Sequence, residues 1–225
     1  MGSGHWNFQS KRYSNQFLHA VKPLVFEILG FCGSVRKKFF PNKDSGEIFL
    51  NIGCGSNLIS NFLNVDFYGW RSSKGVFEHD LRENLPFSSN RFEGIVTEHT
   101  IEHLYPNGTI NLLSEAFRVQ KSEGVLRIGV PDLDKYLEFC ADKMPHPQFA
   151  RYENGCEAIW HLTQNNSHLS IWNFEMLEKH LVAIGFGEVQ KLEFRKGSSG
   201  LADHDATNRE WESLYVEAHK PTTCT

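Results

Sequence analysis

From Ile48 onward, short apolar runs alternate with longer amphipathic segments. The short runs predict strands at residues 48–52, 63–66, 76–79, 94–98, 125–130, 188–194 and 214–218. Apolar positions at helical spacing predict helices over residues 109–120, 133–142 and 174–184. Gly185 follows the last of these, where a left-handed residue commonly ends a helix. This alternation predicts an α/β fold, with a mostly parallel sheet wrapped by helices on both faces.

The two ends of the chain depart from this alternation. The last two predicted strands follow one another without a helix, so we expect them to pair as an antiparallel hairpin at an edge of the sheet. At the other end, residues 16–31 are apolar at helical spacing, and residues 41–46 have the composition of a linker. We therefore divide the chain into an N-terminal helical arm with its linker, residues 1–46, and a domain over residues 47–225.

Two interpretations of the arm stay open. It either packs on the domain or over its ligand cleft, or it lies in a membrane interface as a peripheral contact. The second interpretation rests on Arg36, Lys37 and Lys38, which lie beside Phe39 and Phe40 and would contact anionic lipid.

Residues suited to binding a ligand lie where successive predicted strands end. The first strand runs into Gly53-Cys54-Gly55, the second ends at Asp66, the third is followed by Asp80, and the fourth ends at Glu98. Glycines allow a sharp turn and a close approach of the backbone to a ligand. Because open α/β sheets bind ligands at the carboxyl ends of their strands, the pattern predicts a nucleotide-type ligand, with Asp66 accepting hydrogen bonds from a ribose diol.

These residues resemble those of the class I S-adenosylmethionine-dependent methyltransferases, over about Ile48 to Lys220. The resemblance is greatest to small methyltransferases of the methyltransferase-11-like type, which often accompany cell-surface polysaccharide genes. It rests on four segments: Asn51–Gly55, His79–Phe87, Glu98–Leu104 and Leu126–Leu133. It implies a Rossmann-like, mostly parallel seven-stranded sheet with an antiparallel last strand. The chain departs from the general pattern at Asn51, where an acid is common, and at Asn57, which replaces a third glycine. The segment from Gly55 to Asp66 is also short for a helix.

The resemblance implies S-adenosylmethionine as the cofactor. Asp66 would bind the ribose, Asp80 and the Leu81 amide would bind the adenine, and the two glycines would pass beneath the methionyl part. Glu98 would lie near the sulfonium and the amino group. The expected cofactor-binding residues are Asn51, Gly53, Cys54, Gly55, Asp66, Asp80, Leu81 and Glu98. A nicotinamide dinucleotide fits less well, because Leu58 stands where its fingerprint needs a third glycine.

Three histidines are candidates for the catalytic chemistry. Methyl transfer to a hydroxyl needs alignment and a base for its proton, and an imidazole suits that task near neutral pH. His99 follows the fourth strand directly and is the first candidate. His103 is expected to be mainly structural, and His168 is the further candidate, on the acceptor side.

The segment from His99 to His103 also has the His-x-x-Glu-His pattern of some zinc proteases. A buried strand precedes it directly, and Pro106 and Gly108 would end any helix that begins there. The cofactor motifs already occupy this edge of the sheet, so we expect no metal in the site.

The acceptor is expected to be a small molecule or a glycan precursor, methylated on oxygen. Two long segments, residues 145–170 and 198–210, carry aromatic, acidic and histidine side chains that suit a polyhydroxylated molecule. Asp203 and Asp205 in the second could also hold a divalent ion. Methylation of carbon or nitrogen in another metabolite, or a catalytically weak cofactor-binding protein, are the alternatives.

Composition narrows the partners and the location. A net charge of -4 and a pI near 6.3 argue against a nucleic-acid partner, which needs a basic face. The Asn/Asp-Pro-Pro-aromatic motif of base-amine methyltransferases is also absent after the fourth strand, which continues as Glu98 to Ile101. The five cysteines include no Cys-x-x-Cys pair, and no signal peptide is recognised, so we expect a cytoplasmic protein. We expect no transmembrane segment.

Overall fold

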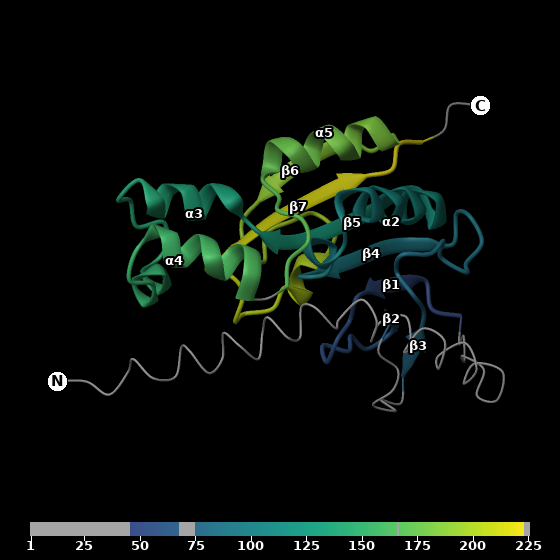
Figure 1. Ribbon diagram of the computed structural model, residues 1–225. Coiled ribbons are helices and arrows are strands. Elements are labelled where there is room, and N and C mark those ends of the chain that lie inside the picture. The colour runs from purple at the N-terminus through teal and green to yellow at the C-terminus, as the bar shows by residue number, and fades with distance from the viewer. Residues whose placement is uncertain (1–45, 68–74, 166, 223–225) are drawn as a thin grey trace. The chain divides into compact units, whose positions relative to one another are not determined.

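The computed structural model describes residues 46–67, 75–165 and 167–222, which form a seven-stranded sheet in the order β3-β2-β1-β4-β5-β7-β6 (Figure 1). The strands are β1 (Phe49–Ile52), β2 (Phe62–Asp66), β3 (Val76–Glu78), β4 (Phe92–Glu98), β5 (Gln120–Pro131), β6 (Gly187–Leu192) and β7 (Ser213–His219). The pairs from β3 through β5 are parallel, and β7 runs antiparallel to both β5 and β6. The predicted sheet and its edge hairpin are therefore confirmed.

The three predicted helices are present, and a fourth was not predicted. The helices are α2 (Pro106–Val119), α3 (Leu133–Cys140), α4 (Gly155–Trp160) and α5 (Phe174–Ile184). Helix α2 begins before the predicted residue 109 because Pro106 fits the first helical position, where a missing N–H costs no hydrogen bond. Gly185 ends α5 with a φ of 120°, as its type predicts.

Helices α2 and α5 pack together on one face of the sheet (Figure 1). Their apolar side chains form the main core with residues of the central strands, and fully buried members include Leu112, Leu113, Leu177, Leu181, Leu50, Ile95 and Ile128. This core holds the central strands in register, and with them the loops at their carboxyl ends.

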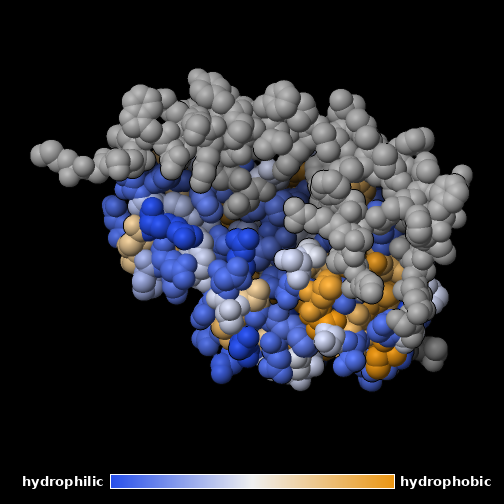
Figure 2. All heavy atoms as spheres, turned by 90° about the horizontal axis from the view of Figure 1, so that it is seen from below, coloured by the Kyte–Doolittle hydropathy of each residue, from blue (hydrophilic) through white to orange (hydrophobic). Residues whose placement is uncertain are grey.

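The opposite face has a smaller apolar cluster, formed by Ile59, Phe62, Val96, Val125 and Leu201. Leu201 belongs to a short 3₁₀ turn, η5 (Leu201–His204), so within the described residues this face is covered by a loop and not by a helix. In the view from below, apolar side chains of the described residues gather in one area of an otherwise mostly hydrophilic surface (Figure 2). Among the described residues, covering helices therefore lie on one of the two faces that were expected to carry them.

In the part of the chain that the structure describes, no helix is long and apolar enough to cross a membrane. The predicted N-terminal arm and its membrane contact lie outside the described residues, apart from Gly46.

Candidate functional site

A tight turn joins the end of β1 to the end of β2. Gly53, with a φ of 71°, and Cys54 both donate backbone N–H groups to the carbonyl of Val65, at 2.8 and 3.1 Å. The N–H of Gly55 donates to Asp66 Oδ2 at 2.7 Å. The glycine turn and the β2 carboxylate, predicted separately as ligand-binding features, therefore form one hydrogen-bonded unit.

The two glycines of this turn are needed for different reasons. A Cβ on Gly53 would lie 2.1 Å from Thr100 Oγ1, so the threonine after β4 fills the space beneath it. A Cβ on Gly55 would meet no atom of the described residues within 4 Å. Open space for a ligand therefore lies at Gly55, whereas Gly53 lets the turn pack on the β4 loop.

Buried amides fix the connection from β1 to β2. Asn51, which is 4% exposed, donates to the Asn57 carbonyl and to Asn64 Oδ1, both at 2.9 Å. Asn64 in turn bonds both the N–H and the carbonyl of Ile59. Hydrogen bonds of this kind let an irregular connection replace a helix here, and the amide of Asn51 is committed to the connection.

Cys54 packs inside the turn. It is 4% exposed, and burial, with a contribution from the nearby Asp66 charge, raises the pKa of its thiol to about 12. A neutral buried thiol behaves as a small apolar side chain, so any contribution of Cys54 to a ligand comes through its backbone.

The carboxylate of Asp80 is already held by an arginine. Arg82 Nη2 lies 2.6 Å from Asp80 Oδ2, and the Arg82 side-chain and backbone N–H groups also donate to it. Burial favours the neutral acid, but these bonds and the arginine charge outweigh it and lower the pKa of Asp80. The neighbouring Leu81 side chain is buried. A ligand amine at Asp80 would share this carboxylate with Arg82.

Glu98, at the end of β4, reaches across to the loop before β7. The backbone N–H of Ala206 lies 3.0 and 3.1 Å from its two carboxylate oxygens. A Cβ on Gly129 would lie 2.8 Å from Glu98 Cγ, so the glycine in β5 makes room for this side chain. Burial raises the pKa of Glu98 despite the Ala206 bond.

His99 follows in a left-handed conformation, with a φ of 48°. Its backbone N–H bonds the Gly129 carbonyl at 2.9 Å. Its Nε2 lies 2.7 Å from the Ser213 hydroxyl, and this hydroxyl donates to the Arg209 carbonyl. Because the one proton of the Ser213 hydroxyl goes to the Arg209 carbonyl, the hydroxyl accepts a hydrogen bond from His99 Nε2.

One buried carboxylate brings the three candidate histidines together. Glu102, in the 3₁₀ turn η2 (Ile101–His103), places its Oε1 at 3.2 Å from His99 Nδ1, 3.9 Å from His168 Nε2 and 4.0 Å from His103 Nε2. Burial would raise the pKa of Glu102, but His99 and the other two imidazoles outweigh it, and the pKa lies below its usual value. From the sequence, Glu102 had a role of its own only in a possible protease motif. Its spacing from His99 and His103 was the available signal.

His168 reaches this cluster because its segment is tied to η2. The backbone N–H groups of Leu169 and Ser170 donate to the Glu102 carbonyl at 2.7 and 3.1 Å. The Ser170 hydroxyl bonds the Ile101 carbonyl and accepts from the Trp172 indole. Nothing in the spacing along the sequence indicates this approach.

The expected acceptor-side segment, residues 145–170, is a folded unit and not an open loop. With α3 it lies beyond the carboxyl end of β5 (Figure 1). It includes α4, two short turns, η3 (Pro147–Arg151) and η4 (His161–Asn165), and a third apolar cluster. The buried members of that cluster are Tyr136, Phe149, Tyr152, Ala158, Leu162 and Trp211. The aromatic residues predicted to face an acceptor therefore include several that form a core.

Acidification is expected to weaken this unit through His161, which contacts the Tyr152 hydroxyl through Nδ1 at 3.0 Å. Burial lowers the pKa of His161 below 6.5. Of the nearby charges, Glu212 and Glu157 act to raise this pKa, and Arg151 and Arg209 act to lower it. The unfolded chain therefore binds the proton first, and the free energy of unfolding falls as pH drops below about 6.5.

His168, whose pKa burial also lowers, adds to this slope with the same sign. Urea unfolding of the wild type and of His161→Gln at pH 7.5 and 5.5 should show a smaller pH effect in the variant. An equal pH effect in both proteins would contradict the assignment to His161.

Asp205 is not free to bind the divalent ion that the sequence left open. Its carboxylate takes two hydrogen bonds from Arg127, including one of 2.5 Å to Nη2, and one from the Arg195 N–H. The side chains of Arg127 and Asp205 are 1% and 3% exposed. The pair anchors the loop that presents Ala206 to Glu98.

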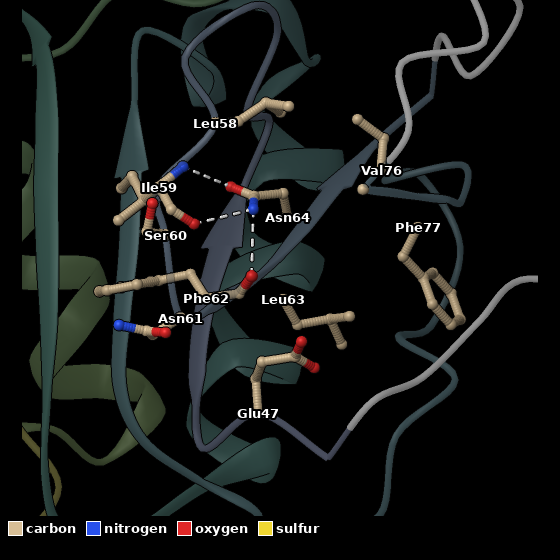
Figure 3. A pocket seen from close by; sticks show the side chains of 11 residues that line it. Glu47, Leu58, Ile59, Ser60, Asn61, Phe62, Leu63, Asn64, Val76 and Phe77 are labelled. Atoms are coloured by element: carbon tan, nitrogen blue, oxygen red, sulfur yellow. Dashed lines mark hydrogen bonds between the residues drawn. The ribbon is translucent and has the colours of Figure 1, made fainter.

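A hollow of about 380 Å³ lies where β2 and β3 begin, the opposite strand ends from the glycine turn (Figure 3). Leu58, Ile59, Val76 and Phe77 line it, and Asn64 makes its hydrogen bonds at its wall. Its place at the amino ends of β2 and β3 puts it at the opposite edge of the sheet from the glycine turn and Asp66.

No protein-family model and no curated protein matches the sequence. Solved structures match its fold. A SAM-dependent methyltransferase from Archaeoglobus fulgidus is 18% identical with a TM-score of 0.51, over 91% of this chain and 99% of that one. The apo form of the S-adenosylmethionine-dependent methyltransferase SibL is 14% identical with a TM-score of 0.50, over 77% of this chain and 50% of that one. A possible exported protein from Bordetella parapertussis is 9% identical with a TM-score of 0.51, over 78% of this chain and 62% of that one.

These identities are low enough that the likeness concerns the fold. The strand order, the antiparallel β7 and the glycine turn at the end of β1 agree with it. The chain therefore has the Rossmann-like fold of the class I S-adenosylmethionine-dependent methyltransferases.

Proposed function

We propose that this protein is an S-adenosylmethionine-dependent methyltransferase that methylates an oxygen of a small molecule or glycan precursor. The observation that carries the proposal is the hydrogen bond from the Gly55 N–H to Asp66 beside the open space at Gly55. It fixes a carboxylate at the end of β2, where an α/β sheet binds the ribose of a nucleotide.

The residues present fit this cofactor at the ribose end. Gly55 presents backbone and no side chain of its own to a ligand, and a carboxylate such as that of Asp66 can accept several hydrogen bonds, so the Gly55 N–H and a ribose hydroxyl can share it. Glu98 supplies a second carboxylate, which is half-buried, at the end of β4, two strands along the sheet from β2. When bound, S-adenosylmethionine supplies an activated methyl group, so the protein needs to align the acceptor and manage its proton.

An oxygen acceptor is favoured by the group of histidines after β4. His99 is held by Ser213 and Glu102. Because Nε2 donates to Ser213, the neutral ring has its lone pair at Nδ1, and it can remove a hydroxyl proton there when the contact with Glu102 opens. Methylation of carbon or nitrogen, or cofactor binding with weak catalysis, remain the competing proposals. Formation of S-adenosylhomocysteine with a panel of sugar nucleotides and other hydroxylated metabolites separates them.

We also propose a cytoplasmic location and no nucleic-acid partner. Cys140 and Cys156 are exposed free thiols, which suits a reducing compartment. The net charge of -4 does not favour a phosphate backbone as partner.

The cofactor assignment is tested by Asp66→Ala. The variant should bind S-adenosylhomocysteine about 2–4 kcal/mol more weakly, a loss of roughly 30-fold to 1,000-fold, because charge-assisted hydrogen bonds to the ribose are lost. Calorimetry measures this directly. Asp66→Asn, which keeps an acceptor for the Gly55 N–H, should lose less.

Unchanged affinity in a folded Asp66→Ala protein would remove this carboxylate from the site. Stabilisation of the wild type by NAD, and not by S-adenosylhomocysteine, would overturn the proposed cofactor.

A further inference from the structure

The carboxylate of Glu102 lacks the hydrogen bonds that a buried charge normally requires. The side chain is 1% exposed, and neither oxygen has a hydrogen-bond partner among the described residues. Its one close contact is the ion-pair distance of 3.2 Å to His99 Nδ1. Burying an ionised carboxylate costs several kcal/mol unless it is paired or coordinates a metal. The group therefore has room for a further positive partner.

His168 presents a lone pair to that carboxylate. Its Nδ1 lies 2.5 Å from the Leu162 carbonyl, which can only accept, so Nδ1 carries the proton. Nε2 is then the unprotonated nitrogen of the neutral ring, and it lies 3.9 Å from Glu102 Oε1. Burial lowers the pKa of His168, which favours the neutral form that metal ions bind.

His103 completes a group of three side chains whose atoms could bind a metal ion. Its Nε2 lies 4.0 Å from the same Glu102 oxygen, and the three donor atoms all lie within 4.8 Å of one another. Zinc ligands at about 2.0–2.2 Å from the ion lie about 3–3.5 Å apart, so the group needs a modest contraction. The side chain of His103 is 45% exposed and can make that movement.

We propose that Glu102, His103 and His168 bind a divalent transition-metal ion, and that Zn²⁺ suits them best. Two imidazoles and one carboxylate favour zinc or a similar ion over Mg²⁺ and Ca²⁺, which prefer oxygen ligands. Three protein ligands leave a coordination position open, and the exposed His103 gives the ion a path from solvent. His99 lies outside this set and orients the carboxylate, as groups around metal ligands commonly do. This proposal replaces the expectation from the sequence that the site holds no metal.

The test uses the full chain, freed of metal by a chelator and titrated with Zn²⁺ by calorimetry and with Co²⁺ by visible absorption. We expect one ion per chain. His103→Ala and His168→Ala should each weaken binding at least about 10-fold, as should Glu102→Gln. His146→Ala, which removes a histidine that caps the separate turn η3, should bind as the wild type does. Because His103 is exposed, its variant should keep the fold, which thermal unfolding checks.

The absence of binding at micromolar Zn²⁺ or Co²⁺ would overturn the proposal. Wild-type affinity in His103→Ala and His168→Ala would do the same, because the ion would then be held elsewhere in the chain. The measurement needs no cofactor or acceptor. Binding of S-adenosylhomocysteine is followed separately, so failure of the metal site and failure of the methyltransferase proposal can be told apart.

Discussion

Replacing His99 by asparagine is expected to lower turnover about 10²-fold to 10⁴-fold while leaving the affinity for S-adenosylhomocysteine close to that of the wild type. Asparagine tolerates the left-handed backbone at this position, where φ is 48°, and its amide takes the place of the ring Nδ1, so it can still donate to Glu102. It cannot take a proton from an acceptor. The loss therefore reports proton transfer and not the fold, and His99→Ala should give a loss of the same order.

The measurement is the rate of S-adenosylhomocysteine formation with an acceptor found by the metabolite screen, together with calorimetry of cofactor binding. Ser213→Ala removes the hydroxyl at Nε2 without removing the imidazole, so it should retain far more activity than His99→Asn. Wild-type turnover in His99→Asn would show that the base lies elsewhere. His168, beside Glu102, and His204, on the loop before β7, are the next candidates.

Asp205→Ala is expected to lower the free energy of unfolding by about 3–5 kcal/mol. The substitution leaves the guanidinium of Arg127, which is 1% exposed, without its bidentate partner. Glu217 lies 3.6 Å from the same guanidinium and compensates only in part. Urea unfolding followed by circular dichroism gives the difference.

An exposed ion pair of this protein provides the matched control. Glu93 and Lys121 are 49% and 41% exposed, so Glu93→Ala should change stability by about 0–1 kcal/mol. If Asp205→Ala were as stable as Glu93→Ala, the buried ion pair would contribute no more to the free energy of unfolding than the exposed one.

The elements that the sequence predicted well are those whose first and last residues are set by residues next to them in the sequence. Helix α5 begins and ends at the predicted residues, because Asn173 caps its first turn and Gly185 terminates it. Helix α4 was missed because it is short and contributes to a cluster whose other members, such as Tyr136 and Trp211, come from distant parts of the chain. A helix of that length depends on tertiary packing more than on its own propensity.

For the candidate site, the sequence by itself determined the glycine turn, the acids at the strand ends and their order. These follow from local patterns. A glycine or an acid at the end of a parallel strand lies at the carboxyl edge of the sheet, whichever residues surround it. Only the tertiary structure decided which groups are already engaged: Thr100 beneath Gly53, Arg82 on Asp80, and Arg127 on Asp205. The tertiary structure also decided that His168 meets Glu102, 66 residues away along the chain. Hydrogen bonds and ion pairs depend on distances of a few ångströms between residues far apart in sequence, and no pattern along the chain contains those distances.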